Sequence, residues 1–556
     1  MNSFPDPLSK MVIFSTLIVS IFLTVSLIPI MTRLADKYQL VDFPNPRKVH
    51  IRPVPRIGGL AMAVGAFIPG LIWARSEQFV TAFLASSGIL VLFGFIDDMK
   101  GLDYKVKFGG QILSALVIIF YGGLRISSLG GMLHGEMPLP EWLTIALPLV
   151  SIVGVTNALN LADGLDGLAG GIALLSLCCI GYLAFLDGST TVLLMTMSVA
   201  GAIFGFLRFN THPASLFMGD TGSQLLGFSA VVLAVKTTQG NTPLSQVLPL
   251  IILGLPVLDT LTVMALRISS GRSPFAPDKN HFHHRLINFG LTHSEAVFVI
   301  YLIQSLLVLS AIFFKYYSDW VLIAGYGVFS MVMVGLFAAL DREALRLPRF
   351  PRVEAAVKTR LRKIREHYVV RLSFGVSKCA IPLLLLASCF IAARIPAYVS
   401  ITALCSSVLI VGAYFAGKQY LGASLRLVLY LTIPLVLYSI EDGRAPWMSE
   451  QWLLLYRLCF GIIAVLVMLT VRFSKRSKGF RMSTMDFLIV FIAVAVPNLT
   501  GRLVQNFNLG LLAVEIIVFF FGFEMLINEL REKFGVLTTA TLAAMAALCV
   551  RGYTGL

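Results

Sequence analysis

The sequence predicts an all-α protein, a polytopic membrane helix bundle, and three observations indicate it. The 556 residues are 57% hydrophobic and only 13% charged, whereas soluble domains carry about 25% charged residues. The mean hydropathy is +0.84. Apolar runs that can cross about 30 Å of hydrocarbon recur from end to end. We therefore expect about 11 spans in residues 1–345 and about 7 more in residues 372–556.

The first apolar run lacks a basic leader and a small-residue cleavage site, so we interpret it as a span and not as a signal peptide. In the first half of the chain the runs lie near 11–31, 57–74, 79–96, 108–123, 142–160, 168–186, 190–207, 222–236, 245–266, 296–314 and 320–340. In the second half they lie near 376–393, 396–416, 420–440, 452–471, 485–500, 507–527 and 535–549.

The net charge of +15 comes from Lys and Arg in short blocks between apolar runs. Topology explains this pattern better than nucleic-acid binding does, because no continuous basic face is present. The positive-inside rule puts the basic loops in the cytoplasm and the N-terminus outside. The seven Cys lie mostly inside apolar runs without metal-type spacing, so structural disulfides are not expected.

An Arg-rich segment divides the chain into three parts. We expect a membrane domain at 1–345, a basic cytoplasmic linker at 346–371 that lies against anionic lipid headgroups, and a C-terminal membrane extension at 372–556. Charged residues in the extension look scattered, and we assign it no chemistry. A flippase-like or scaffold role is a hypothesis that rests only on its length and location.

Four polar residues, Asn157, Asn160, Asp163 and Asp166, stand at steps of three where one apolar run ends and the next begins. On a helix each step of three turns about 300°, so they form a slowly drifting stripe on one side. An intramembrane Asp costs on the order of 2.5 to 3.5 kcal/mol, so the stripe should face protein, water or a bound cation. We interpret it as the wall of a site; interhelical hydrogen bonds that hold the bundle together are the alternative.

Two adjacent carboxylates, Asp97 and Asp98, end the third expected span. At a helix C-terminus they repel one another and oppose the helix dipole, so a positive partner is expected beside them. A solvated helix end is the alternative.

The segment Phe217-Met-Gly-Asp-Thr-Gly-Ser223 comes just before the span 222–236. One interpretation makes Asp220 an N-cap and no more. A helix N-terminus with Gly and hydroxyl groups also binds phosphate oxygens, and a neighbouring Asp suits a magnesium ion that bridges them.

A cytoplasmic loop from 277 to 285 carries His281, His283, His284 and Arg285. A three-His zinc site and a solvated basic loop are alternatives, and no Cys supports the zinc site. A clamp for diphosphate, made of imidazoles and a bidentate Arg, fits the residue types better.

All four motifs fall on the basic side of the same expected bundle. Several acidic groups that face several basic ones describe a magnesium–diphosphate pocket, in which hard oxygens hold the cation and cations neutralise the phosphates. The alternative is a cation-coupled transporter of an anionic solute, whose carboxylates should lie nearer the bilayer midplane.

The order of these motifs resembles the polyprenyl-phosphate N-acetylhexosamine-1-phosphate transferase family, glycosyltransferase family 4. The resemblance covers about residues 1–345 and rests on five motifs: Lys48-Val-His50 through Pro55-Arg-Ile-Gly-Gly59, Asp97-Asp98, Asn157 to Gly167, Phe217 to Gly222 and His281 to His284. It implies a phosphoglycosyl transferase domain that loads a sugar phosphate from a UDP-N-acetylhexosamine onto polyprenyl phosphate, such as undecaprenyl phosphate. The short His-x-His-His loop is similar to the branch that uses UDP-N-acetylglucosamine.

The resemblance also implies the setting of the enzyme. It would lie in the bacterial inner membrane with its active site facing the cytoplasm, and it would begin O-antigen, teichoic-acid linkage or peptidoglycan synthesis. Membrane lipid surrounds it, and a homodimer is compatible with the sequence. The spans after residue 371 exceed the usual family length, which leaves room for an added function or partner.

Roles for single residues follow from the resemblance by position. Asp220 and Asn160 would ligate Mg²⁺, or Mn²⁺ in its place, and Asp166 would read the uracil. Asp97 and Asp98 would line the reaction centre together with Asp220. The other substrate contacts would come from Lys107 on the lipid phosphate, from Asn157 and Asp163 in the polar stripe, and from His281, His283, His284 and Arg285 on the diphosphate and sugar.

The chemistry of the lipid substrate predicts a simple mechanism. A phosphate monoester with a second pKa of about 6 is largely dianionic at pH 7, so polyprenyl phosphate can attack the β-phosphorus without a strong general base. UMP then leaves. We favour one direct displacement, with Asp97 orienting the lipid phosphate, over an aspartyl-phosphate intermediate.

Overall fold

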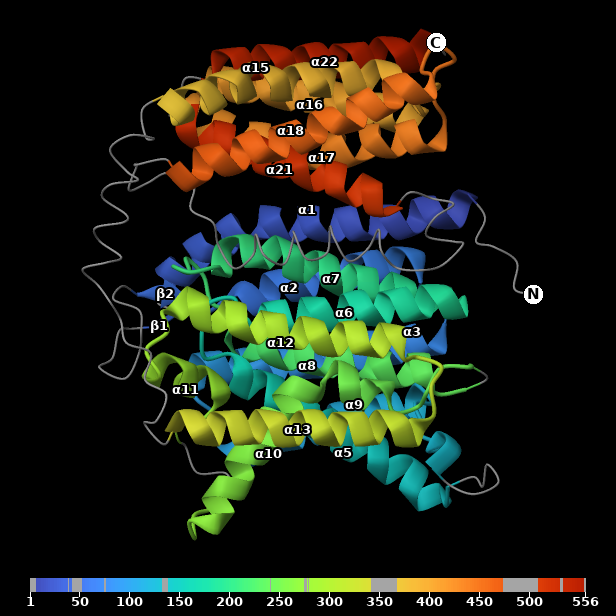
Figure 1. Ribbon diagram of the computed structural model, residues 1–556, viewed down its shortest axis with the longest axis vertical. Helices are drawn as coiled ribbons and strands as arrows, with labels where there is room; N and C mark the ends of the chain where they lie inside the picture. Colours follow the sequence, from blue (N-terminus) through green and yellow to red (C-terminus); the bar gives the residue numbers. More distant parts are fainter. Residues whose placement is uncertain are drawn as a thin grey trace. The chain divides into compact units, whose positions relative to one another are not determined.

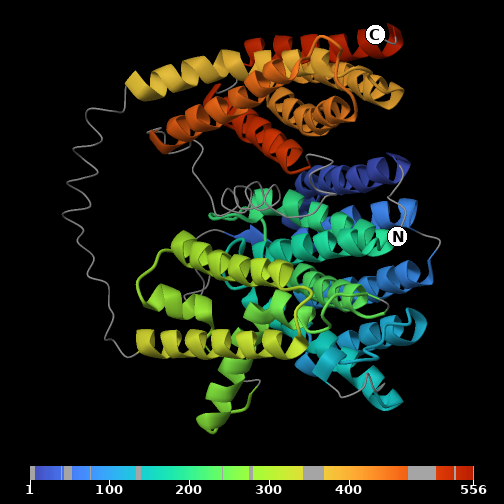
Figure 2. The same cartoon turned by 45° about the vertical axis from the view of Figure 1, so that its right-hand side comes forward.

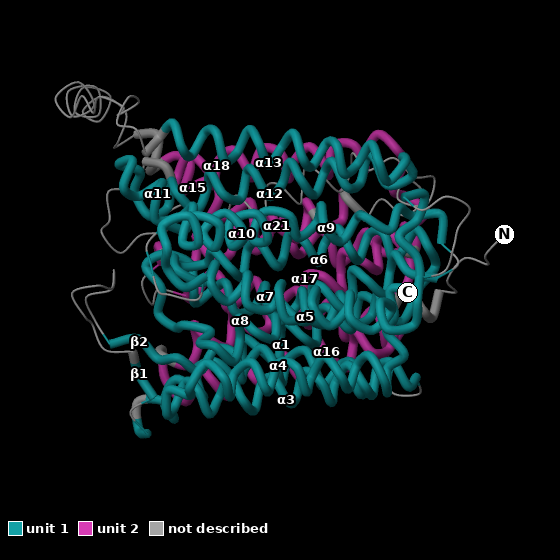
Figure 3. The backbone as a smooth tube through the Cα atoms, turned by 90° about the horizontal axis from the view of Figure 1, so that it is seen from below, with its two compact units in different colours: residues 1–348 teal, residues 349–556 magenta. Residues whose placement is uncertain are grey.

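The computed structural model confirms the all-α fold class, and the chain separates into two compact units, Met1–Pro348 and Arg349–Leu556 (Figure 3). Twelve helices of the described residues are long and apolar enough to cross a membrane. The structure describes residues 7–38, 40–42, 53–74, 77–132, 139–240, 242–274, 278, 280–341, 368–473, 509–530 and 534–554. The expected span at 485–500 and most of the expected linker at 346–371 lie outside these ranges. The functional assignment of the three expected parts stays a prediction.

The first unit consists of helices and one short hairpin of strands (Figure 1). Its elements are α1 (Pro7–Lys37), β1 (Val41–Asp42), β2 (Val54–Pro55), α2 (Gly58–Trp73), α3 (Gln78–Lys100), α4 (Tyr104–Leu116), a π-helical turn (Val117–Tyr121), a 3₁₀ turn (Gly130–Met132), α5 (Glu141–Ala162), α6 (Leu168–Asp187), α7 (Thr190–Asn210), α8 (Gly219–Thr238), α9 (Leu248–Ile252), α10 (Gly254–Ser269), α11 (Phe282–Asn288), α12 (His293–Phe313) and α13 (Asp319–Asp341). Every apolar run expected in this half is helical.

One expected span, 245–266, is wrong as a single helix because it forms α9 and α10. The break falls at Leu253. Pro256 has no N–H to donate to the carbonyl of Ile252, which is where α9 ends, so an uninterrupted helix would lose a backbone hydrogen bond there. After the break, α10 is inclined to its neighbours and its end projects beyond them in both views of the unit (Figures 1 and 2).

The core of the first unit is formed by α6, α7 and α8, whose surfaces are buried on nearly all sides. Helix α8 packs against α3, α5 and α6. Glycines permit these close approaches: a Cβ on Gly94 of α3 would lie 2.6 Å from Cα of Thr221, and a Cβ on Gly227 of α8 would lie 2.7 Å from Cα of Thr156. The N-terminus of α8 is thereby placed against the ends of two other helices.

The hairpin anchors the segment between α1 and α2 to the start of α8. Strands β1 and β2 pair antiparallel. Directly after β2, the backbone N–H groups of Gly58 and Gly59 donate to the carbonyls of Phe217 and Met218 over 3.0 and 2.9 Å. The hairpin and α11 lie at the same end of the first unit (Figures 1 and 3).

The second unit is a separate helical bundle with its own apolar core. Its described helices are α15 (Tyr368–Ile391), α16 (Ala397–Ala416), α17 (Lys418–Asp442), α18 (Glu450–Phe473), α21 (Leu509–Leu530) and α22 (Gly535–Thr554). The charges that look scattered in the sequence form ion pairs between helices. Arg457 bonds Glu441 over 2.8 Å and Arg426 bonds Glu524 over 3.2 Å, so the bundle compensates the charges that it buries.

Candidate active site

The positive partner expected beside the Asp pair is Lys107. Its Nζ lies 3.0 Å from Oδ2 of Asp220 and also forms an ion pair with Asp97. The local fold explains the meeting: Gly101 adopts a left-handed conformation with φ of 65° and ends α3, and α4 then starts so that Lys107 returns toward Asp97. The backbone N–H of Leu102 donates to Asp97 over 2.6 Å. One ammonium group thus joins carboxylates from α3 and α8.

The second member of the pair, Asp98, caps the N-terminus of α8. Its carboxylate accepts hydrogen bonds from the backbone N–H of Asp220 at 2.9 Å, and from the N–H and hydroxyl of Thr221 at 3.1 and 2.7 Å. An anion at this position satisfies N–H groups that have no partner within the helix, and it interacts favourably with the positive end of the helix dipole. A side chain on Gly219, whose φ is 68°, would collide with Asp98. The residue that caps α8 is therefore Asp98 of α3 and not Asp220. The side chain of Asp220 contacts Lys107 instead.

The polar stripe is only half helical, which corrects the expectation of one continuous helical face. Helix α5 ends at Ala162, so Asn157 and Asn160 lie on it while Asp163 and Asp166 lie in the loop that leads to α6. The side-chain oxygen of Asn160 accepts a hydrogen bond from Ser223 over 3.0 Å. This contact places Asn160 beside the first turn of α8, which carries Asp220.

Asn157 is bonded to residues that the sequence analysis missed. Its amide donates to Gln111 over 2.6 Å, and Gln111 donates to Gln224 over 3.3 Å. Gln111 and Gln224 are each 2% exposed. In the sequence, each of these residues stands out only as a single amide side chain within an otherwise apolar run. The substrate contact expected of Asn157 stays a prediction.

Asp163 carries negative charge that its surroundings do not compensate. Burial and the charges of Asp220, Asp166 and Asp98 raise its pKa to about 7, against the smaller opposing effect of Arg56. Burial is the largest of these effects, and the three acidic neighbours show that several carboxylates share this space. The oxygens available there suit a hard divalent cation, which prefers carboxylate and amide oxygens. The donor set is therefore compatible with the expected Mg²⁺.

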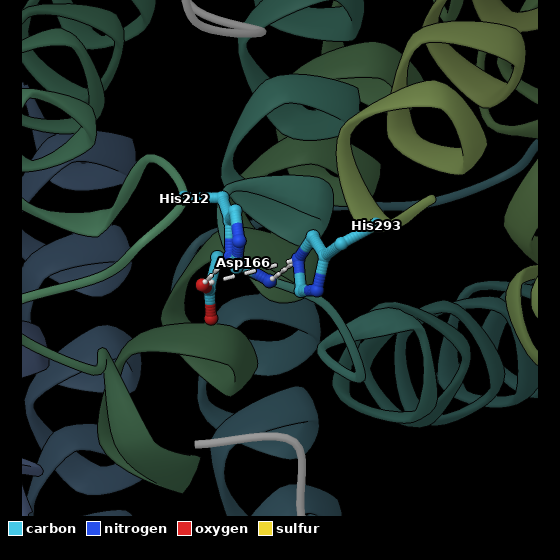
Figure 4. A group of neighbouring side chains, drawn as sticks. All are labelled: Asp166, His212 and His293. Carbon is cyan, nitrogen blue, oxygen red and sulfur yellow. Dashed lines mark hydrogen bonds and ion pairs between the residues drawn. The ribbon is translucent and has the colours of Figure 1, made fainter. Parts of the chain in front are cut away.

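Asp166 meets two histidines from distant parts of the chain (Figure 4). Nδ1 of His212, in the segment after α7, lies 2.7 Å from Oδ2 of Asp166, and the N–H of Ala214 donates to the same oxygen over 3.1 Å. At the start of α12, Nε2 of His293 accepts the backbone N–H of Asp166 over 2.8 Å. Burial raises the pKa of Asp166, but the hydrogen bonds with His212 and with the N–H of Ala214 oppose it, and the pKa lies below its usual range.

The histidine segment at 281–284 is held by Asp259, another residue that the sequence analysis missed. Asp259 is an acidic residue inside an apolar run. Its carboxylate lies 2.9 Å from Nδ1 of His281 and accepts the N–H of Phe282 over 2.8 Å. The adjacent His283 is 3% exposed and packs on Gly164, where any Cβ would collide with its ring. The expectation of a loop is wrong for His283, His284 and Arg285, because α11 begins at Phe282 with His281 as its N-cap residue. The start of α11 therefore meets the loop that contains Asp163.

The remaining predicted residues, His284 and Arg285, also lie on α11. The ring of His284 lies 4.2 Å from that of His283, and Nε of Arg285 donates to the carbonyl of Asn280 over 2.7 Å. Burial, followed by the charges of the neighbouring histidines, lowers the pKa of His283 to about 3, so its ring is neutral at pH 7. Within the described part of the chain, the group with metal-type spacing is Asp166, His212 and His293, and the zinc alternative for the loop gains no support.

The structure thus gathers most of the predicted site at one end of the first unit. Asp97, Asp98, Lys107, Asn160 and Asp220 form one connected group, and the electrostatic coupling of Asp163 to Asp98 and Asp220 places it next to them. The motif residues at positions 48 and 50 lie outside the described residues. The class of protein is therefore a multi-pass membrane protein with an acidic site, rich in histidine at its edge, where several helix ends meet.

Comparisons with known proteins define the family. A family model described as glycosyl transferase family 4 matches residues 80–238. A probable undecaprenyl-phosphate N-acetylglucosaminyl 1-phosphate transferase of Bacillus subtilis (strain 168) is 39% identical over 306 residues, which are 54% of this chain and 85% of the relative. The chain belongs to glycosyl transferase family 4, as its motifs predict.

Two further relatives agree with this assignment. The undecaprenyl-phosphate alpha-N-acetylglucosaminyl 1-phosphate transferase of Escherichia coli (strain K12) is 32% identical over 361 residues, which are 63% of this chain and 96% of the relative. The decaprenyl-phosphate N-acetylglucosaminephosphotransferase of Mycolicibacterium smegmatis is 34% identical over 347 residues, which are 56% of this chain and 84% of the relative.

Proposed function

We propose that the protein transfers N-acetylglucosamine 1-phosphate from UDP-N-acetylglucosamine to a polyprenyl phosphate such as undecaprenyl phosphate, with release of UMP. The relatives are named as polyprenyl-phosphate N-acetylglucosaminyl 1-phosphate transferases, and this supports the acceptor and the sugar. We further propose the bacterial inner membrane as its location, a cytoplasmic active site, an N-terminus outside, and a place as the first membrane step of envelope polysaccharide synthesis.

One observation carries the proposal: Lys107 sits between Asp97 and Asp220, while Asp98 holds the N-terminus of α8 beside them. Joining two anionic substrates requires positive charge where they meet, and it also requires fixed groups that position them. Lys107 is a positive group that two carboxylates hold in one place, and the cation proposed below would supply the remaining positive charge. A soluble nucleotide and a lipid headgroup can meet there because the site lies where helices end.

Asp220 and Asn160 would hold Mg²⁺, with Mn²⁺ as a substitute, and Asp163 adds a carboxylate close by. When bound, the ion neutralises phosphate oxygens and stabilises the charge that develops on the leaving group. Burial, together with the charges of Asp220, Asp166 and Asp98, raises the pKa of Asp163 to about 7. This supports the assignment because a cation would relieve the repulsion among these carboxylates.

The protein's own groups account for the positioning of the reactants. Asp97 is fixed by Lys107 and Leu102 and orients the lipid phosphate, which is already dianionic near pH 7 and attacks the β-phosphorus directly. Lys107 contacts that phosphate as it enters. His283, neutral at pH 7, binds the diphosphate or sugar as a hydrogen-bonding group without adding charge, together with His281, His284 and Arg285.

The test is UMP release by the purified full-length chain in nanodiscs. UDP-N-acetylglucosamine, UDP-N-acetylgalactosamine and UDP-glucose are each supplied with or without undecaprenyl phosphate and Mg²⁺. We expect UMP from UDP-N-acetylglucosamine only when lipid and metal are both present. Release that is independent of the lipid phosphate would contradict the proposal.

Two matched lysine variants refine the assay. Lys107→Gln removes the ammonium between the carboxylates, and a loss of about 10²- to 10³-fold in kcat is expected for a group that stabilises transition-state charge. Lys100→Gln changes an exposed lysine at the end of α3 and should leave turnover unchanged. Equal activity of the two variants would refute the role of Lys107.

A further inference from the structure

The Asp166 side chain is held by groups from two other segments of the chain. His212 follows α7 and His293 begins α12, yet both reach the loop between α5 and α6 (Figure 4). Their rings stack with centroids 4.2 Å apart and planes inclined by 19°. The relatives' names and the motifs in the sequence assign nothing to either histidine.

The two histidines hold different parts of Asp166. Nε2 of His293 accepts its backbone N–H over 2.8 Å, and Nδ1 of His212 bonds its Oδ2 over 2.7 Å. The N–H of Ala214 donates to the same oxygen over 3.1 Å. Backbone and side chain are therefore fixed at once, and the orientation of the carboxylate is determined by three hydrogen bonds.

The second carboxylate oxygen of Asp166 points away from both rings (Figure 4). No hydrogen bond within the described residues engages this oxygen, in contrast to Oδ2 with its two partners. An ionised carboxylate is an acceptor only. The arrangement presents one fixed acceptor toward a ligand that carries an N–H or O–H donor.

Holding a metal ion is the competing use of this cluster, since the three ligand atoms lie within 4.8 Å of one another. The lone pair of His293 Nε2, however, is taken by the backbone N–H of Asp166. Two nearly parallel stacked rings also direct their nitrogens poorly toward a shared ion. The geometry favours positioning over metal binding.

The bond to His293 also explains why this position carries a histidine. To accept an N–H at Nε2, a neutral imidazole must carry its proton on Nδ1. The His293 side chain is 9% exposed, and its Nδ1 has no hydrogen-bond partner in the structure. Nε2 of His293 thus accepts the Asp166 N–H, while the buried Nδ1–H is left without an acceptor, which costs free energy.

The family resemblance implies that Asp166 reads the uracil of the sugar nucleotide. We propose that His212 and His293 are positioning residues that hold Asp166 so that its second oxygen accepts the imide N–H of this base. The inference rests on the proposed function, because it takes the sugar donor to be a uridine nucleotide. Uracil carries N–H at the ring nitrogen where cytosine carries a lone pair. A fixed carboxylate therefore prefers uridine to cytidine nucleotides, and a displaced one prefers them less.

The experiment measures UMP and CMP binding to the purified full-length chain by calorimetry, without turnover. His293→Phe keeps the ring stack but removes the acceptor, and His293→Gln retains an acceptor. His212→Ala removes the donor to Oδ2, and His212→Asn restores one. We expect the Phe and Ala variants to bind UMP about tenfold more weakly with a smaller preference over CMP, and the Gln and Asn variants to recover most of both.

Kinetics of the same variants separate positioning from general damage. His293→Phe should raise KM for the UDP-sugar while KM for polyprenyl phosphate stays unchanged. Unchanged UMP affinity, or an equal loss toward UMP, CMP and the lipid, would overturn the inference. So would Zn²⁺ binding to the wild type that is lost in His293→Phe while UMP affinity persists. Wild-type protein that binds UMP but transfers no sugar phosphate would overturn the proposed function alone.

Discussion

Lowering the pH acts on two neighbouring groups of the site in opposite directions. The pKa of His283 is about 3 in the folded protein, against about 6.5 when unfolded. The folded protein resists protonation of this ring. The contribution of His283 to stability is therefore complete above its pKa in the unfolded protein, and it is lost as the pH falls toward 3. Between pH 7.5 and pH 5 the linkage relation gives a loss of about 2 kcal/mol in the free energy of unfolding.

Asp163 contributes to the pH dependence of the free energy of unfolding with the opposite sign. Its pKa is about 7 in the folded protein, against about 3.9 when unfolded. As the pH falls, Asp163 is protonated at a higher pH in the folded protein than in the unfolded one. Its contribution to stability is therefore complete below its pKa in the unfolded protein, and it is lost as the pH rises through 7. Over the same interval, from pH 7.5 to pH 5, it adds about 2.5 kcal/mol. In the wild type the two contributions cancel to within about 1 kcal/mol.

Single substitutions should uncover each contribution. The assay is reversible unfolding of purified protein in mixed micelles with EDTA, at pH 7.5 and pH 5. Relative to the wild type, His283→Gln should gain about 2 kcal/mol on acidification because the histidine penalty is gone. Asp163→Asn should lose about 2.5 kcal/mol because the carboxyl contribution is gone. The double variant should show neither change.

The result that would refute this reasoning is a His283→Gln variant whose stability changes with pH as the wild type's does. That outcome would mean that the ring is solvated and titrates normally. Saturating Mg²⁺ provides a further check: a cation near Asp163 lowers its pKa, so the acid stabilisation of His283→Gln should shrink when Mg²⁺ replaces EDTA.

Three other predictions address single contacts. Asp98→Ala removes the cap of α8, and thermal unfolding should show a loss of about 1 to 3 kcal/mol, whereas intact stability would contradict the cap. Gly164→Ala places a methyl group against the His283 ring; we expect a destabilisation of about 1 to 3 kcal/mol and a loss of transfer activity, and an unchanged enzyme would argue against the contact. Asp278→Ala removes the carboxylate that lies 2.8 Å from the buried guanidinium of Arg267 and leaves this charge only a backbone carbonyl, that of Pro274; a loss of about 3 to 5 kcal/mol is expected by urea unfolding.

The last of these pairs also predicts behaviour in acid. Burial raises the pKa of Asp278, but the hydrogen bond from Arg267 outweighs it and lowers the pKa to about 2. The pair therefore stabilises the fold fully above the usual Asp pKa of about 3.9 and loses this effect as the pH falls through 2. Unfolding of Asp278→Ala should lack this acid-dependent step, and its persistence would assign the step to other groups.

The sequence by itself determined the fold class and was enough to predict a site. An apolar run of membrane-spanning length has few folds open to it, because its backbone must satisfy its own hydrogen bonds as a helix. Polar residues such as Asp97 or Asp220 at the ends of such runs are costly, so they predict a site without any knowledge of distances. These are local properties of the chain, and motif order alone indicated the family that the comparisons confirm.

Only the tertiary structure decided which groups act on one another. It made Asp98 the cap of a helix more than a hundred residues away, and it ended α5 inside the polar stripe. It also brought His212 and His293 to Asp166. The physical reason is that a hydrogen bond or ion pair acts over about 3 Å in space, while the sequence records only separation along the chain, which helix packing and glycine contacts convert into proximity.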